Sequence, residues 1–244
     1  MDFYRADLHI HTCLSPCGDW GMSPRDIVAK SCEVGLHIIA ICDHNSMENA
    51  GAAVAAGEAA GLQVIPGMEI CSREEVHVLG LFEHLEQARQ MQDKVYAHLP
   101  GKNDPDLWGN QVVANKKNEV ICENSRLLIG ATTLYLDAIV DAVHAVGGLC
   151  IASHVDRPSY SVISNLGFIP PDVKFDALEV SARVPLCEAY QQIPGIDRFP
   201  CITSSDAHFL KDVGRVWTTF LLDAPVFKEI RRALQGFGGR RIEV

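Results

Sequence analysis

Short apolar runs alternate along this chain with longer segments of helical pattern, and this alternation constrains the fold more than any other feature of the sequence. The apolar runs are nearly continuous, as expected of strands that are buried on both faces. They cover residues 6–11, 37–44, 62–70, 76–82, 149–154, 177–181, 201–208 and 216–222. Strands of this kind, separated by helices, predict an α/β fold with a parallel sheet.

The segments between the runs carry signals of helix boundaries. A helix predicted over 24–34 has Ser23 as its N-cap, Pro24 at its first position and Gly35 at its end. Other helices are predicted over 47–60, 85–99, 133–146 and 226–237. The segment 83–131 breaks the alternation, and residues 101–106 within it have the composition of a loop. We therefore expect an insertion at about 83–131 in a single domain that covers residues 1–244.

Side chains of the types that commonly bind metals lie at or just after the ends of five of these runs. They are His9 and His11, His44, Glu69, His154, and Asp206 with His208. Functional residues of a parallel α/β barrel gather at the C-terminal mouth of the strands, so this placement favours a barrel over an open sheet. His77 is an exception, because it lies near the start of its run.

The spacing of these residues indicates the kind of metal. His9 and His11 are two residues apart, which places both rings on the same face of a strand, and Asp206 and His208 repeat the spacing. Mixed imidazole and carboxylate ligands suit Zn, Mn or Fe(II) better than Ca. Glu69 has two oxygens and can bridge two such ions.

Other interpretations apply to single residues. Cys13 and Cys17 lie close behind His11, so a small structural zinc site of cysteine and histidine is an alternative there. Taken singly, the remaining histidines are expected to be structural or at the surface; they are His37, His84, His98 and His144.

Composition limits the class of protein. The formal net charge of -10 argues against a grip on long nucleic acid, although a local cleft can still bind phosphate. No signal peptide and no apolar run of membrane-spanning length is visible, so we expect a cytoplasmic protein whose nine cysteines are reduced. Several of these cysteines lie in apolar runs and are expected in the core: Cys42, Cys150 and Cys201.

Five motifs together resemble the PHP family, named for polymerase and histidinol phosphatase. They are DLHIHT, ICDHNS, PGMEI, ASHVDRP and SSDAH, in this order from residue 7 to residue 208. The resemblance implies a distorted seven-stranded (β/α)7 barrel of the TIM type, two or three divalent metal ions (Zn, Mn or Fe), and phosphoester hydrolysis.

The resemblance also implies a role for each ligand. His9, His11, Glu69 and Asp206 would bind the first metal; Glu69, His77 and His154 the second; His44 and His208 the third. Many relatives supply one more His or Asp after the first motif, where this chain has Cys17, with Asp19 nearby. Cys17 is thus either a thiolate ligand or a bystander, and Asp43 is expected to orient a ligand from behind.

The expected activity is attack on phosphorus by a metal-activated hydroxide, without a nucleophile from the protein. Arg157 and Arg183 follow two of the strands and are expected to bind the substrate phosphate. The substrate would be a small phosphomonoester or a short nucleotide or oligonucleotide phosphodiester. The alternatives are a metal-dependent amidohydrolase and a non-catalytic module stabilised by metal.

Overall fold

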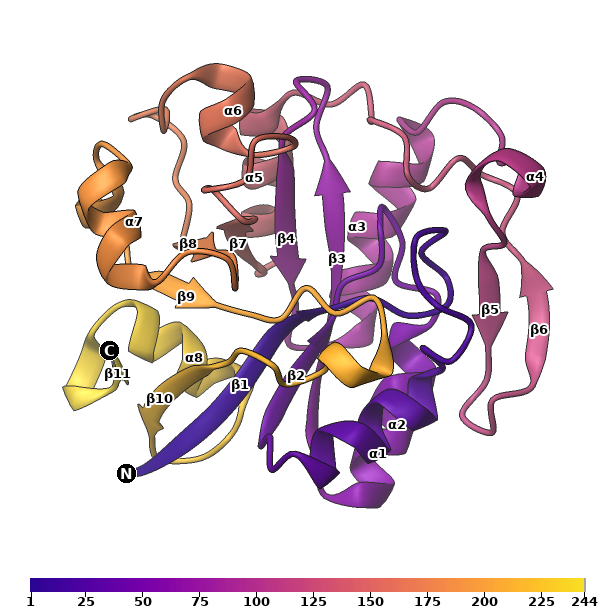
Figure 1. Ribbon diagram of the computed structural model, residues 1–244, viewed down its shortest axis with the longest axis horizontal. Coiled ribbons are helices and arrows are strands. Elements are labelled where there is room, and N and C mark those ends of the chain that lie inside the picture. Colours follow the sequence, from indigo (N-terminus) through magenta and orange to yellow (C-terminus); the bar gives the residue numbers. More distant parts are fainter. Residues whose placement is uncertain (244) are drawn as a thin grey trace.

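A curved sheet forms the centre of the molecule in a computed structural model that describes residues 1–243 (Figure 1). Its strands are β1 (Asp2–Ile10), β2 (Ile38–Ile41), β3 (Gln63–Cys71), β4 (His77–Leu81), β7 (Leu149–Ala152), β8 (Ala177–Val180), β9 (Cys201–Thr203), β10 (Thr218–Leu222) and β11 (Arg241–Glu243). They are hydrogen-bonded in the order β11-β10-β1-β2-β3-β4-β7-β8-β9. Each of the eight apolar runs overlaps one of these strands, although β1 begins four residues before its predicted run.

The sheet curves back on itself just after β9. Ala207 pairs with Ile10 in a parallel bridge, and the N–H of His11 donates to the carbonyl of Ala207 over 3.0 Å. This contact joins the end of β1 to the segment after β9, and the strands β2, β3, β4, β7 and β8 lie between β1 and β9 in the sheet. β10 and β11 extend the sheet on the other side of β1. The barrel-like α/β class is therefore confirmed, but the sheet within residues 1–243 has nine strands in all, where seven were expected.

The strand directions are mixed, which corrects the expectation of a parallel sheet. β1 to β3 are parallel, and so are β7 to β9, but β4 is antiparallel to both of its neighbours and β10 is antiparallel to β1. Only residues 72–76 connect β3 to β4. A parallel pair needs a crossover of about a dozen residues or more, so this short connection forces the chain to turn back.

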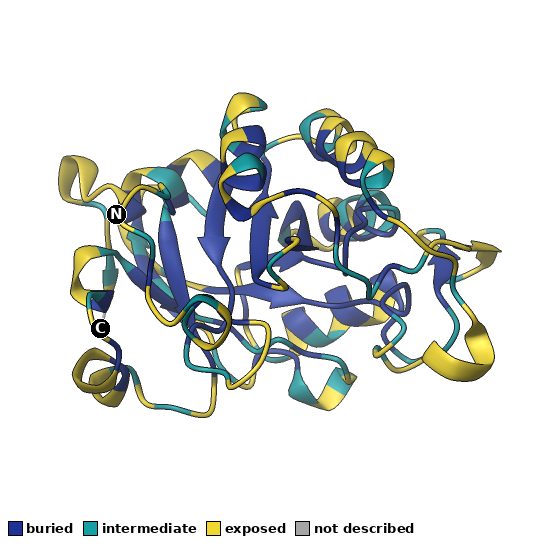
Figure 2. Ribbon diagram, turned by 90° about the horizontal axis from the view of Figure 1, so that it is seen from above, coloured by how far each residue is buried: buried dark blue, intermediate teal, exposed yellow. Residues whose placement is uncertain are grey.

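Helices lie around the curved sheet (Figures 1 and 2). They are α1 (Pro24–Glu33), α2 (Ala50–Ala60), α3 (Leu85–Ala97), α4 (Pro105–Trp108), α5 (Leu136–Ala145), α6 (Val162–Leu166), α7 (Leu186–Gln192) and α8 (Phe227–Leu234). The capping signals of α1 are confirmed, because Ser23 accepts the N–H of Asp26 and Gly35 has a φ of 77°. The sequence did not predict α6 and α7. Among residues 1–243, no helix combines the length and apolar character that a membrane crossing needs.

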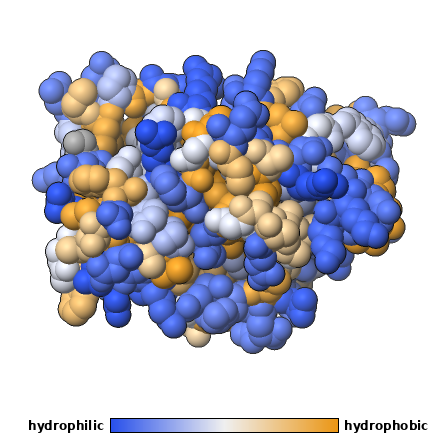
Figure 3. Space-filling view, turned by 90° about the horizontal axis from the view of Figure 1, so that it is seen from below, coloured by the Kyte–Doolittle hydropathy of each residue, from blue (hydrophilic) through white to orange (hydrophobic). Residues whose placement is uncertain are grey.

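Two apolar layers hold the helices and the sheet together, and β2 shows how. Ile38 and Ala40 pack in the same cluster as Phe227 of α8, whereas Ile39 packs with Ile27 of α1 in the other cluster. Both faces of the strand are thus buried, which explains its continuous apolar run. The face of the molecule seen in Figure 3 is mainly hydrophilic, with apolar patches among the polar side chains. Three cysteines are buried as expected: Cys42, Cys150 and Cys201.

The segment 83–131 contains α3, α4 and a hairpin of β5 (Val112–Ala114) and β6 (Val120–Glu123), which lies at the right of Figure 1. The hairpin was not expected, and α4 begins at Pro105, inside the expected loop. The N–H of Val112 donates to the carbonyl of Cys13 over 3.0 Å, and Asn49 bonds both Thr12 and Ala114. The hairpin therefore anchors the loop that follows β1.

Candidate metal centre

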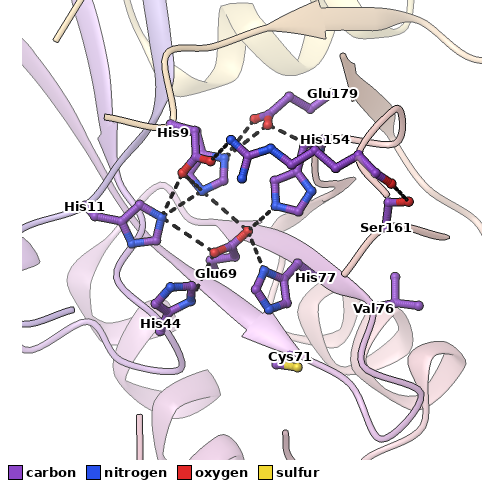
Figure 4. A network of polar contacts seen from close by, with 12 residues as sticks. His9, His11, His44, Glu69, Cys71, Val76, His77, His154, Ser161 and Glu179 are labelled. Atoms are coloured by element: carbon purple, nitrogen blue, oxygen red, sulfur yellow. Dashed lines mark hydrogen bonds and ion pairs between the residues drawn. The ribbon is translucent and has the colours of Figure 1, made fainter. Parts of the chain in front are cut away.

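The eight histidine and carboxylate residues predicted as ligands converge at one mouth of the sheet, and Figure 4 shows most of them. His9 lies on β1, Glu69 on β3 and His77 on β4; the others follow the ends of β1, β2, β7 and β9. All of these side chains are more than nine-tenths buried except that of His208, which is 23% exposed. The set is His9, His11, His44, Glu69, His77, His154, Asp206 and His208.

The reversed strand β4 explains the exceptional place of His77. Because β4 runs opposite to β3 and β7, its first residue lies at the mouth where its neighbours end. His77 Nδ1 is 3.0 Å from Glu69 Oε1. The sequence predicts ligands at the C-terminal ends of parallel strands. His77 is at the start of its strand because β4 is antiparallel to its neighbours.

Glu69 lies at the centre of the cluster, and both of its oxygens are used. Oε1 is 3.0 Å from His77 Nδ1 and 3.1 Å from His154 Nε2, while Oε2 is 3.1 Å from His44 Nδ1. Burial raises the pKa of Glu69, but the imidazoles, His77 first and then His9, outweigh it and hold the pKa well below its usual range. A permanent carboxylate at the meeting point of several imidazoles has the geometry of a bridging ligand.

The hydrogen-bond partners of His9 and His11 fix which ring nitrogens carry protons. His9 Nδ1 lies 3.0 and 3.1 Å from the carboxylate oxygens of Glu179, which only accept, so Nδ1 carries the hydrogen. His11 Nδ1 lies 2.9 Å from Ser15 Oγ, whose one hydrogen is donated to Asp43 over 2.7 Å, so this Nδ1 also donates. In the neutral rings both Nε2 atoms are therefore bare, and they face each other over 3.1 Å.

Carboxylate oxygens surround the two bare nitrogens. Asp206 Oδ1 is 3.4 Å from His9 Nε2 and 3.2 Å from His11 Nε2, and an oxygen of Glu69 is 3.5 Å from each. Burial disfavours a charged imidazole at His9, but the carboxylates, Glu179 first, outweigh it and raise the pKa of His9 well above its ordinary value. The cluster thus attracts positive charge, and its donors fit a divalent ion of the zinc, manganese or iron type.

A third group of donors lies at the edge of the cluster. His11, His44 and His208 bring one ring nitrogen each within 4.8 Å of one another, and the ring of His208 stacks on that of His11 with centroids 4.2 Å apart. The thiol of Cys17 faces His44 and His208. Burial raises the pKa of this thiol, but the two imidazoles outweigh burial and lower the pKa of Cys17 to about 6.

Side chains behind the cluster hold the ligands in place. Asp43 acts on His11 through Ser15, and it also accepts the N–H and the hydroxyl of Thr12 over 2.7 and 2.8 Å. Glu179, which orients His9, was not predicted as a site residue. One signal was present in the sequence, because Glu179 is a charged residue inside the apolar run of β8 and is fully buried.

Strained backbone marks two of the ligands. His154 has a φ of 28° and Asp206 a φ of 49°, in the left-handed region that side chains other than glycine rarely adopt. The turn that carries Asp206 is held by Asp7, which accepts the N–H of Ser205 over 2.9 Å and that of Gly214 over 3.1 Å. Burial, only partly offset by these bonds, raises the pKa of Asp7 to about 6. Asp7 was also missed, although it precedes the first histidine by two residues.

Arginines lie beside the cluster, as expected from the sequence. Arg157 Nη2 is 2.5 Å from Asp206 Oδ2, and Arg157 lines a small cavity of about 160 Å³ at the cluster. A neighbouring cleft of about 720 Å³ is lined by Arg157, Arg183 and Arg215. Arg215 was not predicted, because it follows no strand.

The eight proposed ligands all lie in parts of the chain that match known protein families. The profile of the PHP domain matches residues 7–165, and that of the PHP-associated region matches residues 198–236. A 5'-3' exoribonuclease of Haemophilus influenzae is 32% identical over 80 residues, which cover 32% of this chain and 28% of that protein. An uncharacterized protein of Methanocaldococcus jannaschii is 33% identical over 86 residues, which cover 32% of this chain and 50% of that protein.

Solved structures share the fold. Endonuclease Q of Pyrococcus furiosus has a TM-score of 0.69 and 21% identity, over 99% of this chain and 58% of that one. An endonuclease Q complex with a 27-mer duplex that carries an abasic lesion has a TM-score of 0.71 and 21% identity, over 98% and 58% of the two chains. An amidohydrolase of Chromobacterium violaceum has a TM-score of 0.58 and 18% identity, over 94% and 96%.

Proposed function

The chain belongs to the PHP domain family, and on that premise we propose that it is a metal-dependent phosphoesterase, of the class of phosphoric ester hydrolases (EC 3.1), whose active site is the cluster at the barrel mouth. One observation carries the proposal. The Nε2 atoms of His9 and His11, which are bare when the rings are neutral, face each other over 3.1 Å, with carboxylate oxygens of Glu69 and Asp206 beside them. Four electron-rich groups in a buried space call for a cation between them.

The proposed ligand sets follow the three groups of donors. His9, His11, Glu69 and Asp206 would hold the first ion; Glu69, His77 and His154 the second; His44 and His208, with Cys17, the third. Two or three divalent ions, when bound, would polarise the phosphoryl oxygens and acidify a water. Zn, Mn and Fe all fit a mixed set of imidazoles and carboxylates.

The protein's own groups would bind and orient the phosphoryl group. Arg157 borders the cluster, and its fork can hold two phosphate oxygens once Asp206 is engaged by an ion. Tyr160 stacks on His77, with centroids 4.7 Å apart, and forms one wall of the same cavity. The second layer, Glu179 behind His9 and Asp43 behind Ser15, keeps the bare nitrogens aimed at the ions.

The proposed substrate is a phosphomonoester of nucleotide type or a short oligonucleotide. The cavity at the cluster is small, at about 160 Å³, and suits little more than a phosphoryl group. The cleft beside it is larger, at about 720 Å³, and its arginines, Arg157, Arg183 and Arg215, suit further anionic groups. The expectation that this chain does not bind long nucleic acid, which was based on its net charge of -10, has no support. Endonuclease Q, which has a similar fold, forms a complex with a 27-mer duplex.

The amidohydrolase alternative is less well supported by the cavity. Among residues 1–243, no lysine lines the cavity at the cluster, so a carbamylated lysine bridge has no counterpart there. Glu69 lies in the centre instead. We also propose that residues 1–244 act as one barrel domain, with 83–131 as an insertion that supports the mouth.

The test compares wild type with Glu69→Gln, which keeps the shape of the side chain and removes its charge. Metal content would be measured by plasma mass spectrometry after supply of Zn or Mn, beside hydrolysis of p-nitrophenyl phosphate, bis-p-nitrophenyl phosphate and a short single-stranded oligonucleotide. We expect the variant to lose bound metal and to lose activity by a factor on the order of 10³, because several kcal/mol of charge stabilisation disappear.

His84→Ala is the matched control, since His84 is an exposed histidine at the start of α3. It should keep both metal and activity. A wild-type protein that binds neither Zn nor Mn would refute the proposal, and so would a Glu69→Gln variant with wild-type metal content and activity. Metal binding without hydrolysis of any of the three substrates would refute the phosphoesterase assignment and leave the metal site in place.

A further inference from the structure

We propose that Cys17 is a thiolate ligand of the ion at the His44–His208 edge of the cluster, and that this position therefore selects zinc over manganese or magnesium. The inference rests on the proposed function to the extent that the mouth must bind metal. It adds a sulfur donor to a site made otherwise of imidazoles and carboxylates. Soft thiolates favour Zn, whereas Mn and Mg prefer oxygen donors.

The loop that carries Cys17 is folded tightly against the mouth. The N–H of Gly18 donates to the carbonyl of Ser15 over 2.8 Å, and a Cβ at Gly18 would lie 2.4 Å from the carbonyl oxygen of Thr12. The N–H of Asp19 then donates to the carbonyl of His208 over 2.9 Å. Cys17 is thus held between two fixed points, one of which is the backbone of its proposed co-ligand.

The imidazoles beside Cys17 present unused nitrogen. His208 Nδ1 lies 2.8 Å from the carbonyl oxygen of Asp206, which only accepts, so in the neutral ring Nδ1 carries the hydrogen and Nε2 is bare. His44 lies on the other side, with Nδ1 3.1 Å from Glu69 Oε2. The thiol of Cys17 faces both rings, so a sulfur donor lies beside two imidazole donors.

The other nearby cysteine does not share this position. Cys13 is buried, and its Sγ lies 3.7 Å from the carbonyl oxygen of Val112 and 3.8 Å from Asn49 Nδ2, against the hairpin. A closed structural zinc site that uses both Cys13 and Cys17 therefore does not fit. Cys17 is the exposed one of the pair and lines the arginine cleft, where an ion and a substrate can reach it.

The experiment replaces the native metal by cobalt in the full-length protein, with a phosphine reductant in place of thiols. A cobalt–thiolate bond gives an intense charge-transfer band in the near ultraviolet, which imidazole and carboxylate ligands do not give. We expect this band in wild type. We expect Cys17→Ser to lose it and to bind about one ion per chain fewer, because only the edge site depends on the sulfur.

Two further variants make the result specific. Cys17→His should keep the full ion content without the band, because an imidazole can replace the thiolate. Cys32→Ser, a change at an exposed cysteine on α1, should leave the band unchanged. In competition between Zn and Mn, wild type should fill the edge site with Zn, and Cys17→Ser should lose that preference.

Full cobalt content in wild type without the band would overturn the inference and leave the proposed function intact. A band that persists in Cys17→Ser would also overturn it, because the sulfur would then belong to another cysteine. A wild-type chain that binds no cobalt, zinc or manganese would instead overturn the proposed function on which the inference rests.

Discussion

Two groups of charged side chains in this molecule are built in opposite ways. At the end of the barrel closed by α8, Glu229 accepts hydrogen bonds from Arg232 Nη1 over 2.7 Å, from Arg240 Nε over 2.9 Å and from the N–H of Asp223 over 3.0 Å. Arg240 also pairs with the Asp223 carboxylate. Every acceptor in this group meets a donor, and opposite charges alternate.

The cluster at the mouth has the opposite arrangement. His9 Nε2 and His11 Nε2 meet acceptor to acceptor, and the carboxylates of Glu69 and Asp206 add further negative charge. A set of charged groups whose donors and acceptors all pair with one another needs no bound ligand and stabilises the fold. A set that concentrates lone pairs in a buried space attracts a cation, and this difference separates a binding site from a structural ion network.

The largest effect that would sharpen this contrast is expected from Glu179→Gln. The amide can no longer offer two acceptor oxygens to His9 Nδ1, so the ring loses its fixed tautomer while every proposed ligand remains. We expect the affinity for the first metal to fall by about 10–100-fold. Isothermal titration of the metal-free protein with zinc measures this change.

The matched control is Glu188→Gln, at an exposed glutamate in the first turn of α7. It should bind zinc as wild type does. Unchanged zinc affinity in Glu179→Gln would contradict the view that second-layer carboxylates set the protonation of the cluster, even if Glu69→Gln abolishes binding.

The case of Glu179 also shows how far the sequence reaches. The barrel-like α/β class, the eight strands and the convergence of the histidines follow from apolar periodicity and from the place of each ligand on its run. These signals are local, because each can be recognised within a short stretch of the sequence. Glu179 and Asp7 interrupt apolar strands, and a charged residue in a buried strand is itself a sign of a polar partner.

Other features depended on pairings that no local pattern encodes. The direction of β4 is set by the short connection of residues 72–76, and the place of His77 at the mouth follows from it. The hairpin β5–β6 has strands of only three and four residues, too short for a clear alternation. Arg215 reaches the cleft from a loop, where its distance from any strand gave no indication of its surroundings.

A smaller effect is expected at the self-satisfied network. Glu229→Gln removes the charge that Arg232 and Arg240 share, and we expect the free energy of unfolding to fall by about 1–2 kcal/mol at neutral pH. Metal content should not change, which would separate this network from the mouth. Urea unfolding of the metal-free proteins measures the first quantity and plasma mass spectrometry the second.

The pH dependence of the same variant tests the cause. Hydrogen bonds, the one from Arg240 first, lower the pKa of Glu229 from 4.5 to about 2. A carboxyl with a depressed folded-state pKa stabilises the fold above its unfolded pKa and loses that contribution as the pH falls. The difference between wild type and Glu229→Gln should therefore be constant above about pH 5 and shrink between pH 4.5 and 2. A difference that stays constant across this window would show that charge is not responsible. Glu33→Gln, in the exposed pair with Lys30, should have little effect at any pH.

The smallest effect, a change in KM, is expected at two arginines that belong to neither group of charged side chains. Arg232 and Arg240 are committed to Glu229, whereas Arg183 and Arg215 form no ion pair with any carboxylate among residues 1–243. Their charge is therefore free for a ligand in the cleft. We expect Arg183→Ala and Arg215→Ala each to raise KM for an oligonucleotide by about 3–10-fold, with kcat unchanged, because an exposed arginine contributes about 1 kcal/mol to binding an anion. KM for p-nitrophenyl phosphate, which carries no second anionic group, should stay the same. Arg89→Ala, at an exposed arginine on α3, should change neither constant. An equal rise in KM for both substrates would place these arginines at the scissile phosphate, and an unchanged KM for both would make the cleft an ordinary solvated surface.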